Sequence, residues 1–226
     1  MKKIILPAIL FLVMPSIVLI KPGVLSEVRV QNRRTVNEVI NSIENSVLER
    51  LGISSIGGYD SLTLIAIKDE KILECWLKSD SKWILQKIYP FTGYSGDLGP
   101  KLRRGDRQIP EGIYGVEYLN PNSRFYLSFK LNYPNATDIL NAERDKRTDL
   151  GDDIFIHGDR VTIGCIPVGD KKIEELFYLV AKLGKRNVKV IISPIDFRKT
   201  RDIPIGTKDW VTELYNDISK EMEVFR

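Results

Sequence analysis

The chain contains a single histidine, His157, and one of its two cysteines, Cys165, follows it closely. A free thiol has a pKa of about 8.5, so a cysteine nucleophile needs a neighbouring base or cation to become a thiolate. The imidazole of His157 is the side chain best suited here to accept that proton near neutral pH. The two residue types together indicate a thiol enzyme.

The residues around this pair predict how it is positioned. The run Asp153–Ile156 is typical of a strand that delivers His157 to a turn at Gly158. Residues Val161–Ile163 are expected to return beside that strand before the chain bends at Gly164. Such a hairpin would set the imidazole beside the sulfur.

The bend itself predicts an oxyanion site. Because glycine has no Cβ, the chain can turn sharply at Gly164 and direct the backbone amides of residues 163–165 at one point. Convergent amide donors of this kind stabilise the oxyanion of an acyl-transfer reaction. We expect the amides of Gly164 and Cys165 to act in this way, with the Thr162 hydroxyl as a supporting group.

Spacing alone leaves other interpretations open, because buried cysteines are usually inert and lone histidines are usually structural. The second cysteine, Cys75, shares the apolar face of a strand-like run with Leu73 and Leu77, which predicts burial. A disulfide between Cys75 and Cys165 would remove the nucleophile, and exported proteins do form disulfides.

The order of residues in this region resembles a known signature. His157-Gly158 followed by Thr162-Ile163-Gly164-Cys165 is similar to the His-Gly … Ser/Thr-x-Gly-Cys motif of L,D-transpeptidases, the YkuD-type cysteine enzymes of bacterial peptidoglycan. Three upstream segments resemble the murein branch of that family with a short active-site loop: Gly99–Lys101, Gly105–Tyr114 and Asn120–Arg124. The resemblance covers Ser61 to Phe197. It implies a mainly β fold with helices (α+β), an L,D-transpeptidase-like β-sandwich or mixed-sheet catalytic domain.

The resemblance also implies a reaction. Cys165 would attack an L,D peptide bond of a peptidoglycan stem peptide, most familiarly the bond between diaminopimelate and the fourth-position D-alanine, and form a thioester. His157 would accept the thiol proton and later assist the incoming amine or water. The backbone carbonyl of Gly158 would orient the imidazole. No cofactor is implied, and one histidine with one nearby thiol supplies a zinc site poorly.

Two positions depart from the family pattern. Many relatives have an arginine where Pro167 stands, and others have a histidine where Ile163 stands. The short loop between the histidine and the cysteine implies a more open substrate groove.

Several functions compete with transpeptidation. Attack on the thioester by an amine, from a second stem peptide or an envelope protein, gives transfer, whereas attack by water gives hydrolysis of the carboxypeptidase or amidase type. A catalytically silent murein-binding envelope protein is a second class, and it predicts a broken Cys–His pair. A thiol redox protein is a third, but the chain has no C-x-x-C motif.

Six side chains that precede the His-Gly motif in the sequence are candidates for substrate binding. Their alternative interpretation is ordinary loop surface, because exposed charges rarely need a special explanation. The candidates are Tyr94, Lys101, Arg103, Tyr114, Arg124 and Tyr133.

Composition limits the class of protein. The 226 residues are 43% hydrophobic and 28% charged, which is enough material for one sizeable domain. The net charge of +4 is modest, and no basic block is interleaved with aromatics, so a nucleic-acid partner is not indicated.

The amino-terminal residues predict export. Lys2 and Lys3 precede an apolar run from Ile4 to Ile20, which is either a cleaved signal peptide or a membrane anchor, and this run would be the chain's contact with a membrane. We therefore expect a periplasmic or cell-envelope protein with four parts: the signal or anchor (1–21), a helical linker (22–58), the catalytic domain (59–200) and a packed carboxy-terminal helix (201–226).

Periodicity and turn residues predict the remaining elements. A helix capped by Thr35 should run to Gly52, and it is either a spacer from the membrane or a brace on the catalytic domain. The later expectations, in chain order, are strands at 62–67, 71–77 and 83–89, a long loop at 90–112, strands at 113–119 and 125–130 around a turn at 120–123, a short helix or loop at 138–149, a helix from Asp170 to Gly184, a strand at 187–193 and a terminal helix through Trp210, Leu214 and Ile218.

Overall fold

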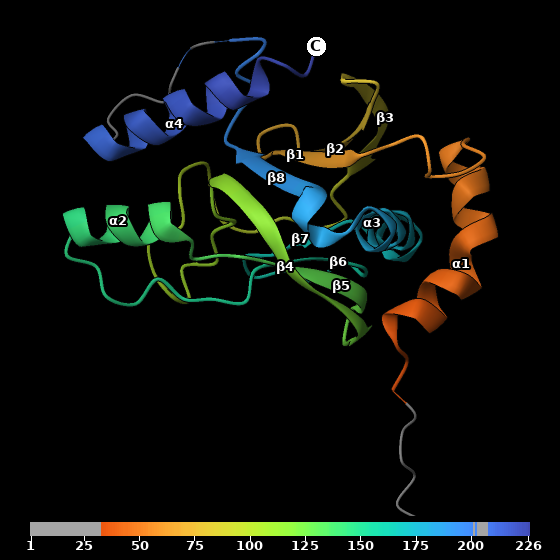
Figure 1. Cartoon of the computed structure of the whole chain (residues 1–226). Helices are drawn as coiled ribbons and strands as arrows, with labels where there is room; N and C mark the ends of the chain where they lie inside the picture. Colours follow the sequence, from red (N-terminus) through yellow and green to blue (C-terminus); the bar gives the residue numbers. More distant parts are fainter. Residues whose placement is uncertain (1–32, 201, 203–207) are drawn as a thin grey trace, which may run out of the picture. The chain divides into compact units, whose positions relative to one another are not determined.

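The computed structural model describes residues 33–200, 202 and 208–226, so the predicted export segment lies outside the described residues. Eight strands form a sheet in the order β3-β2-β1-β8-β4-β5-β6-β7 (Figure 1). Their bounds are β1 Ser61–Ile67, β2 Ile72–Ser79, β3 Lys82–Pro90, β4 Gly112–Ser123, β5 Tyr126–Leu131, β6 Phe155–His157, β7 Ile166–Pro167 and β8 Val188–Ser193. The helices are α1 Val36–Leu51, α2 Ala136–Arg144, α3 Asp170–Leu183 and α4 Asp209–Met222, with a short 3-10 turn, η1, at Lys185–Asn187. The expected mainly β architecture with helices is confirmed.

The first three strands, which the sequence predicted as strands, form an antiparallel meander. β1 pairs with β2, and β2 pairs with β3. On its other side β1 runs parallel to β8, so it lies inside the sheet, and six of its seven residues are buried. Cys75 in β2 is fully buried, as its apolar face predicted.

The sheet changes partners along β4. Its first residues, Gly112–Gly115, pair with β8, and its later residues pair with β5. The turn expected at residues 120–123 is wrong, because these residues continue β4 as far as Ser123 and the chain reverses just beyond them. β4 and β5 thus form a long hairpin whose turn is at residues 124–125.

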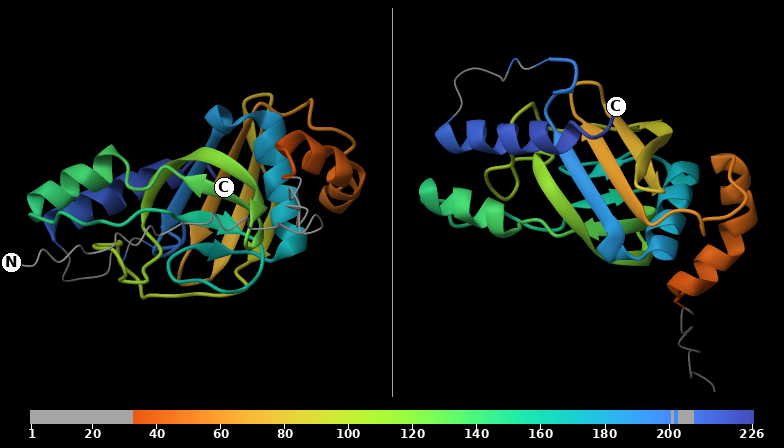
Figure 2. Two further views of the ribbon diagram at one scale, coloured as in Figure 1. Left: turned by 90° about the horizontal axis from the view of Figure 1, so that it is seen from below. Right: turned by 45° about the horizontal axis from the view of Figure 1, so that its top comes forward.

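Two hydrophobic cores form on opposite faces of the strands β1, β2 and β8. On one face, Leu64 and Val190 pack toward α3 and the strands β5 to β7. On the other, Ile65 and Ile191 pack under Tyr215 and the rest of α4. Figure 2 shows α3 and α4 on these opposite sides. Because successive strand residues point to opposite faces, a single strand can feed both cores.

The helix α1 begins and ends where its sequence predicted. The Thr35 side chain accepts a hydrogen bond from the Glu38 amide while the Glu38 carboxylate accepts from the Thr35 amide, and Gly52 ends the helix in the left-handed conformation. The helix packs beside α3, where Arg50 pairs with Glu174 and Glu175, both at 2.8 Å. Residues 33–226 form one compact unit that includes this helix.

The long loop between β3 and β4 has an internal anchor. Lys68 and Glu111 form an ion pair of 2.8 Å whose two side chains are fully buried. The Lys68 ammonium also donates to the carbonyls of Gly99 and Ile109, and the Glu111 carboxylate accepts from the hydroxyl of Tyr215 in α4. The anchor therefore joins the loop to both the sheet and the terminal helix.

Within the described ranges, no helix combines the length and the apolar character required to cross a bilayer.

Candidate active site

The short strand β6 carries His157 into a buried position. Its pairing partner on one side is β5, and on the other it runs parallel to β7, which directly follows Cys165. The hairpin expected from Val161–Ile163 is therefore wrong: these residues form no strand, and Val161 and Ile163 are 63% and 75% exposed. The parallel pairing of β6 with β7, and not a hairpin, brings the histidine and the cysteine to one place.

The imidazole of His157 is held at one nitrogen and open at the other. Nδ1 lies 2.5 Å from the carbonyl oxygen of Gly158. A carbonyl only accepts hydrogen bonds, so the proton belongs on Nδ1 and Nε2 carries a lone pair. Nε2 is buried and has no hydrogen-bond partner among the described residues. Burial lowers the pKa of His157, so the imidazole is neutral at neutral pH.

Residue 158 must be a glycine, because the surrounding atoms leave no space for a side chain. A Cβ at this position would lie 2.6 Å from an Asp170 carboxylate oxygen and 2.7 Å from the carbonyl oxygen of Phe125. The same Asp170 oxygen accepts a hydrogen bond from the Asp159 amide. The His-Gly pair therefore fits a crowded turn that also touches the start of α3.

The thiol of Cys165 is free, and so is that of Cys75. The Cys165 sulfur donates to the Asp153 carbonyl at 3.6 Å. Burial raises the pKa of the Cys165 thiol, while a backbone hydrogen bond from Phe155 acts in the opposite direction. Both shifts favour a neutral thiol and a neutral imidazole in the resting site over a preformed ion pair.

A threonine hydroxyl organises the loop that carries the cysteine. Thr162 Oγ1 accepts hydrogen bonds from the amides of Gly164, at 3.2 Å, and Cys165, at 2.9 Å, and donates to the Cys165 carbonyl at 2.7 Å. Gly164 has a backbone φ of 132°, which residues other than glycine rarely adopt. A Cβ at this position would also lie 3.1 Å from the carbonyl oxygen of Gln108. Both amides predicted for the oxyanion site thus point at one oxygen atom in the resting structure.

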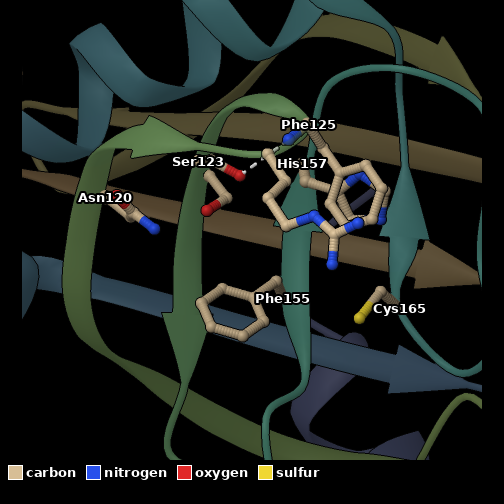
Figure 3. A pocket seen from close by; sticks show the side chains of 8 residues that line it. Asn120, Ser123, Phe125, Phe155, His157 and Cys165 are labelled. Carbon is tan, nitrogen blue, oxygen red and sulfur yellow. Dashed lines mark hydrogen bonds between the residues drawn. The ribbon is translucent and has the colours of Figure 1, made fainter.

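A pocket of about 170 Å³ contains both His157 and Cys165 (Figure 3). The Phe155 ring forms one wall, and Phe125 lies against the imidazole. The remaining lining residues are Asn120, Ser123, Arg124 and Ser128, all from β4, β5 and the turn between them. An apolar wall, several polar groups and one cation are suited to a polar peptide that carries a carboxylate.

Of the six side chains considered for substrate binding, Arg124 lines this pocket. Lys101 is buried and is engaged with the Asp106 carboxylate and the Arg103 carbonyl. The Arg103 side chain is exposed on the same loop. Tyr94 is half-buried, its ring lies 5.5 Å from the Lys71 ammonium, and burial raises its pKa to about 12.

Tyr114 and Tyr133 belong to the hydrophobic core. They are 2% and 3% exposed, and their ring centroids are 6.1 Å apart. The Tyr114 hydroxyl donates to the Asp138 carboxylate at 3.2 Å, and the Tyr133 hydroxyl donates to the Leu150 carbonyl at 3.0 Å. Neither side chain lines the pocket, so substrate contact from these two tyrosines is not supported.

Sequence reasoning missed most of the pocket wall. Phe155 could have been found, because it precedes His157 by one strand period and must share its face. Asn120 and Ser123 lie in the segment Asn120–Arg124 that resembles the family, but no local pattern places them or Phe125 beside the histidine, because they reach it only through the pairings of β4 with β5 and of β5 with β6.

The YkuD family, described as the L,D-transpeptidase catalytic domain, matches residues 74–201, which is more than half of the chain. The chain belongs to this family. The Escherichia coli K12 protein that carries the provisional name L,D-transpeptidase YafK is 37% identical over 138 residues, which are 59% of this chain and 53% of that protein. The chain therefore spans about half the length of the curated relatives that it matches.

Two solved structures align with part of this chain. The helical cell shape determining protein Pgp2 from Campylobacter jejuni aligns with a TM-score of 0.49 and 22% identity, over 67% of this chain and 55% of that one. Bd1075 from Bdellovibrio bacteriovorus aligns with a TM-score of 0.44 and 21% identity, over 74% and 57% of the two chains.

Proposed function

We propose that this protein is a peptidoglycan-modifying cysteine acyltransferase that acts on stem peptides through a thioester. The observation that carries the proposal is the His157 imidazole, whose Nδ1 is held by the Gly158 carbonyl and whose buried Nε2 has no partner in the pocket that also contains Cys165. A lone pair kept free beside a thiol is what a general base requires.

In the proposed first step, the Cys165 thiol turns from the Asp153 carbonyl toward Nε2 of His157 and transfers its proton there. The sulfur attacks the carbonyl carbon of the L,D peptide bond, the carbon–nitrogen bond breaks, and the imidazolium returns the proton to the departing amine. The product is a thioester on Cys165. In the second step an amine or a water molecule, deprotonated by the same imidazole, attacks the thioester and releases the thiol.

The oxyanion of each step would be held by the amides of Gly164 and Cys165. In the resting structure both amides donate to Thr162 Oγ1, so the oxyanion would share or replace this hydroxyl as their acceptor. Thr162 would thereby keep the two donors directed at one point before substrate arrives. Preorganised donors of this kind contribute about 3 kcal/mol each to acyl transfer.

Arg124 would recognise a carboxylate of the stem peptide. It lines the pocket and forms no ion pair with a described residue, so its guanidinium is available to a ligand. Guanidinium groups bind carboxylates with two parallel hydrogen bonds, which fixes orientation as well as charge. Peptidoglycan lies outside the cytoplasm, so the proposal also requires export to the periplasm or cell envelope, for which the basic and apolar amino-terminal sequence is suited.

The experiment is intact-mass analysis of the full-length protein, in detergent, after incubation with a carbapenem and with purified muropeptides. We expect one covalent adduct on the wild type and on the control Cys75→Ala, and none on Cys165→Ala. His157→Ala should remain folded and acylate at least about 100-fold more slowly. An adduct that persists without Cys165, or a wild type that forms no adduct, would contradict the proposal.

Product analysis then decides the second step. Joined stem peptides, or a stem peptide joined to a protein amine, indicate transfer, and shortened stems with no new amide indicate hydrolysis.

A further inference from the structure

The hairpin of β4 and β5 supplies much of the pocket. Four of the eight lining residues come from the end of this hairpin: Asn120 and Ser123 lie in the last part of β4, and Arg124 and Phe125 form the turn that leads into β5. The Ser123 hydroxyl accepts a hydrogen bond from the Phe125 amide at 3.1 Å (Figure 3). The shape of the pocket therefore depends on how this hairpin turn is fixed.

The turn ends in an unfavourable backbone conformation. Tyr126 has a φ of 72°, in the left-handed region that bulky side chains avoid. Such a conformation persists only when the surroundings hold it. One restraint is the Tyr126 hydroxyl, which donates at 2.6 Å to Glu174, a carboxylate on α3 that is 4% exposed.

The second restraint comes from Arg34, immediately before α1. Its backbone amide donates to the Asn122 side-chain oxygen at 3.0 Å, and its carbonyl accepts from the Asn122 side-chain nitrogen at 2.8 Å. Its guanidinium donates to the Pro121 carbonyl at 2.6 Å and to the Tyr126 carbonyl at 3.4 Å, and it lies 5.9 Å from the Tyr126 ring centroid. Figure 1 shows the start of α1 beside this hairpin.

These contacts join segments that are far apart in sequence. Arg34 lies 87 and 92 residues before Pro121 and Tyr126 in the sequence. It also precedes the family match, which begins at residue 74. Carbonyl groups at a turn otherwise bond to water, so a guanidinium that bridges two of them fixes their separation. The segment before α1 thus holds the pocket wall from outside the matched catalytic region.

We propose that Arg34 is a positioning residue that fixes residues 120–126, the end of β4 and the turn into β5, for substrate binding. The inference rests on the proposed function for its substrate, a stem peptide. Because Arg34 touches the wall and not the thiol or the imidazole, its loss should weaken binding of the peptide while leaving the intrinsic reactivity of Cys165 unchanged.

The test compares Arg34→Met with Arg33→Met in the full-length protein. Arg33→Met is a matched control, because it removes the same charge at the adjacent position. Arg33 itself forms no hydrogen bond with residues 120–126 in the described structure. For Arg34→Met we expect the KM for muropeptide to rise about tenfold with kcat within about twofold of wild type. Hydrogen exchange at the amides of residues 120–126 should become faster.

Two further variants distinguish loss of this contact from general unfolding of the protein. Asn122→Ala removes the other half of the contact from an exposed position and should reproduce the KM effect, whereas Arg34→Lys, which keeps one donor for the Pro121 carbonyl, should restore part of it. Alkylation of Cys165 by iodoacetamide should proceed equally in all variants. Unchanged KM and unchanged exchange in Arg34→Met, or an equal loss in Arg33→Met, would overturn the proposal.

The exchange and alkylation measurements use no peptide substrate, so they separate the two hypotheses. A wild type that does not process muropeptides would refute the proposed function. Equal exchange in the Arg34 and Arg33 variants would refute the positioning role, whatever the substrate.

Discussion

The phenyl ring of Phe125 lies with its centroid 4.5 Å from that of the His157 imidazole, and the two planes are inclined by 31°. One residue precedes β5 and the other ends β6, so the contact crosses the pairing of these two strands. The ring covers one face of the imidazole while the Gly158 carbonyl fixes its Nδ1. The direction of the free Nε2 therefore depends on the hairpin as well as on β6.

Replacement of Phe125 should weaken the base without unfolding the protein. In Phe125→Ala the imidazole loses the ring that limits its rotation, and we expect acylation of Cys165 to slow about tenfold, equivalent to about 1.4 kcal/mol of barrier. Phe125→Tyr should retain most of the wild-type rate. Stopped-flow acylation by a carbapenem measures both. Phe155→Leu, which alters the same pocket without touching the stack, is the control, and an equal loss there would show that pocket shape alone matters.

The resting protonation states predict a pH profile. Burial raises the pKa of Cys165 and lowers that of His157, so both groups are neutral near pH 7. Alkylation by iodoacetamide in the absence of substrate should therefore rise with pH through a midpoint above the ordinary thiol value of about 8.5. Acylation by substrate uses neutral His157 as its base and should decline only below about pH 6.5. An alkylation midpoint below neutrality would instead reveal a thiolate–imidazolium pair.

Removal of the Thr162 hydroxyl should disorder the loop that carries the nucleophile. Thr162→Val keeps the shape of the side chain but leaves two amides and one carbonyl without their present partner. We expect kcat/KM for muropeptide to fall about 10- to 100-fold, and Thr162→Ser to recover most of the activity. Liquid chromatography with mass detection gives the rates. Wild-type rates in the valine variant would exclude the supporting role that we assign to this hydroxyl.

The buried Lys68–Glu111 ion pair should contribute to the free energy of unfolding. Lys68→Met leaves the Glu111 carboxylate buried without its cation, which should lower the free energy of unfolding by about 3–5 kcal/mol. The double variant Lys68→Met/Glu111→Leu removes both charges and should cost less than the single one. Urea unfolding followed by circular dichroism measures both values. A single variant within about 1 kcal/mol of wild type would mean that water or another group compensates the carboxylate.

Local patterns predicted much of this fold. Thr35, Glu38 and Gly52 bound α1 because capping needs only neighbours in sequence. The apolar alternation of Leu73, Cys75 and Leu77 predicted both a strand and their burial, because side-chain direction in a strand repeats every two residues.

The candidate active site also has features that local sequence predicts and features that depend on distant contacts. The sequence by itself determined that His157 and Cys165 are the candidate base and nucleophile, because residue type sets which proton each group can exchange, and it predicted that the chain turns at Gly158 and Gly164. The crowding that excludes a side chain at these two glycines comes from residues far apart in the chain, so only the tertiary structure showed it. Only the tertiary structure decided that β6 and β7 run parallel where a hairpin was expected, and that the β4–β5 hairpin, with Arg34 holding its turn, forms the wall of the pocket. Periodicity records which face of an element is buried, but the choice of pairing partner depends on contacts between residues far apart in the chain, which no local pattern encodes.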